Sequence, residues 1–345
     1  MPVPPEVLFD RFFRTEVPAT TRQSYKGKQD LDVLEPALRS LLVSIQESLN
    51  EALRSERKDI AEHVDHGPFH FDYVDSTVPN AVAFVHNGYS FIGVTMPLIN
   101  KLLQVCARLS RSEAITTVLG VRLPPEERDA LHVVLLRTQL NFVVCHEYTH
   151  HVHGHQSIRE SGGLFNEILE DHPDADMVEE QAREMDADGY ASYLVLFHLF
   201  AEGRAHSIRL LKADMEPDRI QDELLFDSFV AAVGGFLFVS PPTALDSTRV
   251  YNLVHPPQAA RMDNIMKSAL SWCSQNRPTL QARMSTERFQ MIMNAVAQAT
   301  WGMNGGSNWG AQSAFLQSRE GSEYLRKLQK RLKAHVQSLG RNQAI

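Results

Sequence analysis

The chain has few cysteines, no long apolar run and no excess of positive charge. Its 345 residues include only three cysteines, Cys106, Cys145 and Cys273, which lie far apart and form no CxxC pair. This spacing argues against a disulfide framework and against a sulfur-rich zinc site, and it favours reduced thiols in a reducing compartment. The formal net charge of −8 gives no reason to expect nucleic acid or an anionic membrane as a partner.

The most apolar windows, residues 131–145 and 228–239, are both shorter than the roughly 20 residues that cross a bilayer. The first residues, MPVPPEVLFDRFFRTEV, have no basic start followed by an apolar core, so we expect no secretory signal. With 43% hydrophobic side chains the chain can bury a large core, in one large domain or two smaller ones. We therefore expect a cytoplasmic protein without a transmembrane segment.

The residue pattern predicts helices around one short region of strands. Leucine and isoleucine recur every three or four residues over 30–63, which is typical of an amphipathic helix. FHFDYV and NAVAFV are rich in β-branched and aromatic residues, and Asn87-Gly88 is a strong turn signal, so residues 80–95 should form a β-hairpin. Residues 302–312 have the composition of a loop. Further helices are expected from Met96 onward and over 126–153, 177–200, 221–238 and 322–337.

The stretch CHEYTHHVHGH, residues 145–155, holds five histidines at the end of an apolar run. Within it, His146, Glu147 and His150 spell HExxH. Helix positions four apart differ by about 40° of rotation, so the two imidazoles can share a metal ion while Glu147 points toward a metal-bound water. This is the geometry of a zinc hydrolase. The pattern alone is nonspecific, and such a site needs a third protein ligand.

The sequence REMDADGYAS, in the helix expected at 177–200, offers carboxylates for the third position. The metzincin pattern HExxHxxGxxH is excluded, because the glycine stands at 154 and Gln156 replaces the last histidine. Glu184 and Asp188 share a helix face, so one can bind zinc while the other accepts a hydrogen bond from a ligand histidine. Read alone, EMDADG is more typical of a solvated acidic face. In a chain that also contains HExxH, and in a helix that continues with the apolar YASYLVLFHLF, these carboxylates are more readily explained as metal ligands.

Other candidates carry less weight. Three acidic residues lie toward the N-terminal turn of the same helix, where acids serve the helix dipole: Asp176, Glu179 and Glu180. Solvent exposure or capping is expected to account for three further histidines: His151, His153 and His155. Cys145 should be a packed, small apolar residue.

Taken in order, HEYTH, EMDAD and HPPQAAR (255–261) resemble the motifs of gluzincin metallopeptidases related to the HtpX and CAAX prenyl-protease families. Those families show HExxH, then ExxAD, then an HP motif followed by an arginine. NAVAFVHNGYSFIGVTMPLI resembles the strand pair and helix that they place before the zinc helix, so the resemblance spans roughly residues 70–265. It implies zinc as cofactor, with Glu147 as general base and Asp188 orienting a ligand histidine. The implied zinc ligands are His146, His150 and Glu184.

The same resemblance places His255 and Arg261 near the zinc. In the expected mechanism of peptide hydrolysis, a donor such as His255 stabilises the oxyanion. A histidine before Pro-Pro can equally open a helix, with Arg261 paired to a surface acid. NAVAFV would be the edge strand of the cleft, where a substrate could pair as an added strand. The residues of that strand are Asn80, Ala81, Val82, Ala83 and Phe84. Membrane spans flank the site in those families and have no counterpart here, so their membrane setting and prenylated substrates do not transfer.

We therefore expect an α+β fold, with a predominantly helical zincin core and a small antiparallel sheet beside the HExxH helix. The expected regions are a helical part at 1–66, the metallopeptidase core at 67–270 and a helical part at 271–345. The expected function is zinc-dependent endopeptidase activity on a protein or peptide substrate. Two alternatives are a catalytically silent zinc sensor and, by analogy, a triggered protease of the phage-exclusion type. Retention of Glu147, which metal binding alone does not need, favours the enzyme. The basic C-terminal helix could dock a partner.

Overall fold

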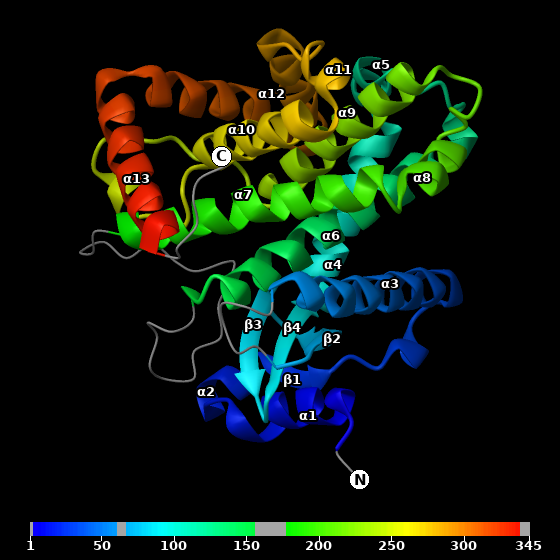
Figure 1. Ribbon diagram of the computed structural model, residues 1–345, viewed down its shortest axis with the longest axis vertical. Coiled ribbons are helices and arrows are strands. Elements are labelled where there is room, and N and C mark those ends of the chain that lie inside the picture. Colours follow the sequence, from blue (N-terminus) through cyan, green and yellow to red (C-terminus); the bar gives the residue numbers. More distant parts are fainter. Residues whose placement is uncertain (1–2, 61–66, 156–176, 339–345) are drawn as a thin grey trace. The chain divides into compact units, whose positions relative to one another are not determined.

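The computed structural model describes residues 3–60, 67–155 and 177–338. Over these residues the protein is mainly helical with one four-stranded sheet, which confirms the α+β class (Figure 1). The chain forms two compact units: Met1–Lys101 with His146–Leu169, and Leu102–Cys145 with Glu170–Ile345. The predicted division into three regions stays a prediction.

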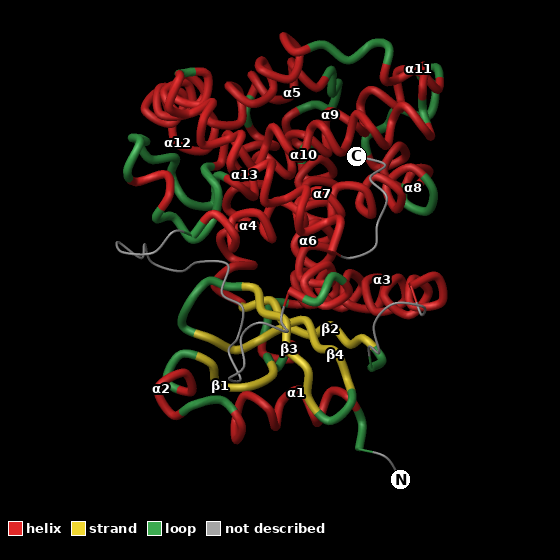
Figure 2. The backbone as a smooth tube through the Cα atoms, turned by 60° about the vertical axis from the view of Figure 1, so that its left-hand side comes forward, coloured by secondary structure: helices red, strands yellow, loops and turns green. Residues whose placement is uncertain are grey.

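The first unit is built around a sheet with strand order β1-β2-β4-β3, drawn in yellow in Figure 2. β1–β2 and β3–β4 pair antiparallel, whereas β2–β4 pair parallel. The expectation of a wholly antiparallel sheet is wrong at this pair, because β4 returns from its hairpin with β3 in the direction of β2. The elements of the first unit are α1 (Pro5–Arg11), the π-helix η1 (Phe12–Glu16), α2 (Ala19–Arg22), β1 (Tyr25–Lys28), η2 (Leu31–Val33), α3 (Pro36–Ile60), β2 (Phe69–Ser76), β3 (Ala81–His86), β4 (Tyr89–Thr95) and the start of α4 (Met96–Arg111).

The hairpin predicted at 80–95 is confirmed. His86 pairs with Tyr89, and the two residues between them, Asn87 and Gly88, have φ values of 47° and 76°. A two-residue turn with positive φ at both positions matches the right-handed twist of the strands, which is why Asn-Gly is favoured there. Asn80 lies just before β3, so the strand begins one residue later than NAVAFV predicts.

Successive side chains of β2 point to opposite faces of the sheet. On one face, His70 packs against Phe9 of α1, within an aromatic cluster that includes Phe91. On the other face, the Tyr73 hydroxyl donates to the backbone oxygen of Leu42 in α3, 3.0 Å away. Helices α1 and α3 therefore cover opposite faces, and each buries an apolar side of a thin sheet.

The second unit is helical. Helix α7 packs against α10 and α13, and α9 packs against α12. Its elements are the rest of α4, α5 (Glu113–Leu119), η3 (Pro125–Glu127), α6 (Asp129–Val152) as far as Cys145, α7 (Val178–Phe200), α8 (Arg204–Leu210), α9 (Asp218–Leu237), η5 (Arg249–Tyr251), α10 (Gln258–Asn276), α11 (Pro278–Gln281), α12 (Thr286–Gln317) and α13 (Arg319–Ser338). From His146 onward α6 belongs to the first unit. The expected helices near 126–153, 177–200, 221–238 and 322–337 are confirmed within about three residues. The helix expected at 30–63 begins later, at Pro36, and residues 61–63 lie outside the described residues.

The prediction of a loop at 302–312 is wrong, since this stretch continues α12. Only Gly302 departs from helical geometry, with φ 67° and ψ −159°. A residue with a Cβ adopts these angles at a cost of about 1–3 kcal/mol, so this glycine permits a sharp bend. Helix α12 therefore has two arms, residues 286–301 and 303–317. None of the helices in the described ranges is both long and apolar enough to span a membrane.

Candidate metal centre

The HExxH sequence lies at the end of α6, where the helix is buried. The helix ends at Val152, and Gly154 follows in the left-handed region with φ 67°, a conformation in which glycine commonly ends a helix. The ring nitrogens Nε2 of His146 and His150 lie 3.0 Å apart, and both side chains are buried. Two ligands at 2.0–2.1 Å from a tetrahedral zinc are separated by about 3.4 Å. The pair therefore fits a shared metal ion.

A third histidine, His155, orients the second one. Its Nδ1 lies 2.8 Å from Nδ1 of His150, on the ring side away from His146. If His150 donates here, its Nε2 carries the lone pair that a metal needs, which is the usual role of an outer partner of a ligand histidine. No local pattern signals this contact, because His155 lies beyond the end of the helix.

The expectation that the other histidines are solvent-exposed is wrong. His151, His153 and His155 are each no more than 3% exposed. Nε2 of His151 lies 3.0 Å from the backbone oxygen of Phe91, so this ring ties the end of α6 to β4. The end of α6 and the residues after it are therefore buried on several sides. The polar histidines in this part of the sequence give no sign of that burial. Cys145 is buried, as expected.

Glu147 is also buried, and its charge acts on a residue from the N-terminal region. Burial raises the pKa of Tyr25, a hydrogen bond from Asn80 lowers it, and the negative charge of Glu147 raises it further. The Asn80 Nδ2 donates to the Tyr25 hydroxyl over 2.7 Å. A tyrosine from β1 thus belongs to the surroundings of the candidate general base, and no local pattern around Tyr25 predicts this.

In the second unit, α7 presents the predicted carboxylates on one buried face. Glu184 and Asp188 are 7% and 0% exposed. Both oxygens of Asp188 accept hydrogen bonds from Arg261, one from Nε and one from Nη2, each at 2.7 Å. This fork-to-fork geometry is the strongest arrangement of an arginine with a carboxylate. Arg261 is therefore paired with a buried acid, and its alternative interpretation as the partner of a surface acid is excluded.

His255 lies beside the other carboxylate. Its Nδ1 is 3.1 Å from Oε2 of Glu184, and its side chain is 19% exposed. The next helix, α10, begins at Gln258 after Pro257, so His255 stands three residues before the helix rather than opening it. The structure therefore brings His255 to Glu184, and it brings Arg261 to Asp188.

Buried side chains that could hold a metal ion occur in both units. They are His146, His150, His153 and His155 in the first unit and Glu184 and Asp186 in the second. Asp186 lies 3.7 Å from Nε2 of His335 in α13. Of the weaker acidic candidates, Glu180 pairs with Arg183, and Glu179 lies 3.9 Å from Arg331. Asp176 and the connection at 156–175 lie outside the described residues.

Among the strands that the structure describes, β3 pairs with β4 alone and therefore lies at an edge of the sheet. The predicted substrate strand, from Ala81 to Phe84, thus has one side that could accept an added strand. Whether a substrate pairs there stays a prediction.

Comparison of the chain with models of protein families, with curated proteins and with solved structures finds no match. The resemblance to the gluzincins therefore rests on the sequence motifs alone.

Proposed function

We propose that this chain is a zinc-dependent endopeptidase, with His146, His150 and Glu184 as zinc ligands. The observation that supports this best is the buried pair of imidazoles in HExxH, whose Nε2 atoms converge to 3.0 Å. Buried histidines at this separation are either a neutral hydrogen-bonded pair or the ligands of one metal ion. The acid between them in sequence, Glu147, favours the second, because a structural histidine pair has no use for it.

The carboxylates of α7 support the same proposal. Glu184 supplies an anionic ligand, and Nδ1 of His255 lies 3.1 Å from its Oε2, so a protonated His255 would stabilise the charge of this carboxylate. Asp188 is held on both oxygens by Arg261, so the orientation of its carboxylate is fixed. Ligands in most zinc enzymes are oriented in this way by a further shell of partners.

In this proposal zinc, when bound, supplies a Lewis acid that polarises the peptide carbonyl and lowers the pKa of water. Glu147 takes the proton of the attacking water on its carboxylate and delivers it to the leaving amine. His255 contributes its side chain near Glu184, where it can donate to the developing oxyanion. An extended peptide is held along β3 by main-chain hydrogen bonds.

Metal content and cleavage test the proposal together. The purified chain should contain one zinc per molecule by mass spectrometry of the elements, and His146→Ala and Glu184→Gln should each lower it. The matched control is His206→Ala, because His206 is exposed. Asp188→Asn should weaken zinc binding by about 10–100-fold, as the loss of an outer partner does. A wild-type chain that binds no zinc refutes the proposal.

Glu147→Gln separates the enzyme from a silent sensor. This variant should keep its zinc and lose cleavage of a denatured protein pool by at least about 100-fold, the usual contribution of a general base. Comparison of new protein termini in cells that express the wild type or Glu147→Gln would then identify the substrate. Full activity of Glu147→Gln contradicts the mechanism, and zinc without any cleavage by the wild type supports the sensor.

A further inference from the structure

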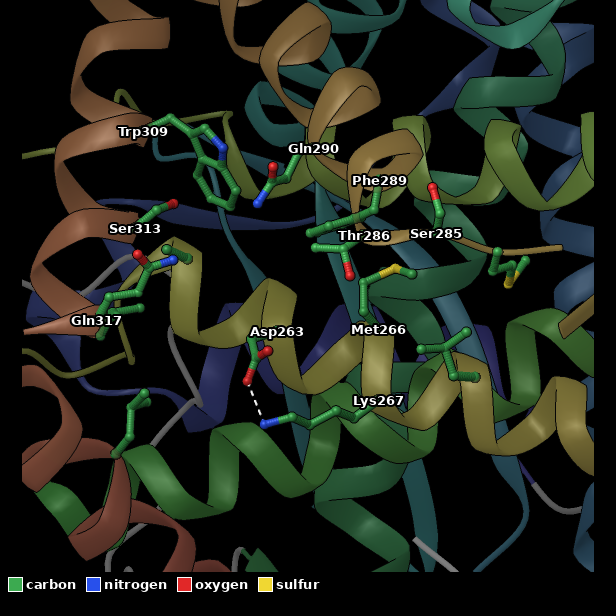
Figure 3. A pocket seen from close by; sticks show the side chains of 15 residues that line it. Asp263, Met266, Lys267, Ser285, Thr286, Phe289, Gln290, Trp309, Ser313 and Gln317 are labelled. Atoms are coloured by element: carbon green, nitrogen blue, oxygen red, sulfur yellow. Dashed lines mark hydrogen bonds and ion pairs between the residues drawn. The ribbon is translucent and has the colours of Figure 1, made fainter. Parts of the chain in front are cut away.

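A cavity of about 510 Å³ lies within the second unit, between α10 and the two arms of α12. Its size is typical of sites for small molecules, which have volumes of about 300–1,000 Å³. Figure 3 shows Trp309, Ser313 and Gln317 on one arm of α12, Phe289 and Gln290 on the other, with α10 below them. The bend at Gly302 allows both arms to line the same space.

The lining is mainly apolar, and its exposed polar groups are suited to an uncharged ligand. Apolar walls come from Met266 and Leu270 of α10, Phe289, Trp309 and Leu316 of α12, and Leu325 of α13. Its two charged residues, Asp263 and Lys267, lie 2.6 Å apart and neutralise each other. The uncharged polar side chains of the lining are those of Ser285, Thr286, Gln290, Ser313 and Gln317. For Gln290, Ser313 and Gln317 the structure records no side-chain hydrogen bond to any residue that it describes, so these three are available to a ligand.

Helix α10 connects this cavity to the residues of the candidate metal centre. The face toward α7 carries Arg261, which holds Asp188, and Asn264, whose Nδ2 donates to the backbone oxygen of Met185 over 2.6 Å. Ser268 lies on the same face of α10, close to Gly189 of α7. Its Oγ would lie 3.0 Å from a Cβ added to that glycine.

The cavity uses the opposite face of the same helix. Asp263, Met266 and Leu270 line it. With 3.6 residues per turn, the mean direction of these three residues differs by roughly 160° from that of Arg261, Asn264 and Ser268. A molecule bound in the cavity therefore contacts one face of α10, and Arg261 on the opposite face of α10 binds Asp188.

We propose that the cavity binds an uncharged, mainly apolar small molecule with hydrogen-bonding groups, and that its binding stabilises α10 in its docked position against α7. Such a ligand binds only the closed arrangement, so it suppresses any local opening that separates Arg261 from Asp188. Any effect of this ligand on zinc binding or catalysis rests on the proposed function. The binding of the ligand and its effect on the exchange of α7 amides are independent of the proposed function.

The probes are two dyes of opposite character: Nile red, which is uncharged and apolar, and 8-anilinonaphthalene-1-sulfonate, which is an anion. The full-length chain should bind Nile red saturably, with a blue-shifted emission, and should bind the anion at least ten times more weakly. Equal or tighter binding of the anion overturns the assignment to an uncharged ligand. The absence of saturable Nile red binding overturns the site.

Two substitutions fill the cavity from opposite arms of α12, Ser313→Trp and Gln290→Trp. Each should weaken Nile red binding at least tenfold, and circular dichroism confirms that the variant is folded. Ala311→Trp is the matched control, since Ala311 is exposed on the same arm and does not line the cavity. Two folded filling variants that bind like Ala311→Trp place the dye elsewhere and refute the proposal.

Hydrogen exchange tests the coupling without reference to zinc or activity. With Nile red at ten times its dissociation constant, amides in residues 183–192 that exchange through undocking of α10 should slow by about 11-fold. The measurement is made with and without a zinc chelator, so its result stands even if the chain binds no metal. Unchanged exchange at saturating dye refutes the coupling through α10.

Discussion

Replacement of Arg261 by methionine should strongly destabilise the protein. Arg261 and Asp188 are 8% and 0% exposed, and two hydrogen bonds of 2.7 Å join them. Arg261→Met leaves the Asp188 carboxylate buried beside an apolar side chain. Removal of one partner from a buried ion pair costs about 3–5 kcal/mol, a large fraction of the 5–15 kcal/mol that stabilises a typical protein.

Two further variants identify the source of this loss. The double variant Asp188→Leu, Arg261→Met removes both charges and should recover at least half of the lost free energy of unfolding, since a buried pair can be replaced by apolar residues at little cost. Lys267→Met lies on the same helix but breaks an exposed pair, with side chains 55% and 51% exposed. It should change the free energy of unfolding by less than about 0.5 kcal/mol.

Urea unfolding of the four proteins provides the measurement. The comparison holds when the slope of the free energy against urea concentration is the same in each, since a change in slope indicates altered compactness. If Arg261→Met costs less than about 1 kcal/mol, or no more than Lys267→Met, Arg261 and Asp188 do not form a buried contact with two hydrogen bonds.

Two further predictions concern the second unit. Burial raises the pKa of Asp227 from 3.8 to about 6, although Arg288 opposes this shift. The protonated carboxyl therefore stabilises the folded state. This contribution is complete below pH 3.8 and is lost as the pH rises through about 6. Between pH 5 and 7 the wild type should thus lose roughly 1 kcal/mol relative to Asp227→Asn in urea unfolding; a constant difference contradicts this. Gly302→Ala should cost about 1–3 kcal/mol through backbone strain alone, because no atom lies within 4 Å of the added Cβ. Gly306→Ala, in a regular part of α12 with equally open surroundings, should raise the thermal midpoint slightly, and equal effects of both substitutions would refute the strain.

Local patterns predicted the parts of the protein that depend on local geometry. The spacing of His146, Glu147 and His150 places them on a helix, and Asn87-Gly88 predicts the hairpin, because both features are fixed within a few residues. The parallel pairing of β2 with β4 was not predictable in this way, since it arises because β4, and not β3, lies next to β2 in the sheet.

The surroundings of the site depend on contacts between residues far apart in the chain. Tyr25 approaches Glu147 from the N-terminal region, and nothing in its neighbours in sequence indicates this. The pairing of Arg261 with Asp188 is similar, because the resemblance of the motifs placed Arg261 near the zinc without naming Asp188 as its partner. The error at 302–312 had the opposite origin. Several glycines suggested a loop, yet only Gly302 leaves the helical conformation.

The two units are interleaved along the chain, and this has a consequence for biosynthesis. The first unit combines residues 1–101 with the later segment His146–Leu169, so its early part lacks Tyr148 as a packing partner for Phe69 when it first leaves the ribosome. Phe91 likewise gains its hydrogen-bonded contact with His151 only after α6 has been made. The sheet can therefore reach its final packing only once synthesis has passed the HExxH sequence. A fragment cut at residue 101 keeps α1 and α3 but leaves Phe69 without its packing partner Tyr148, which exposes apolar surface and favours aggregation.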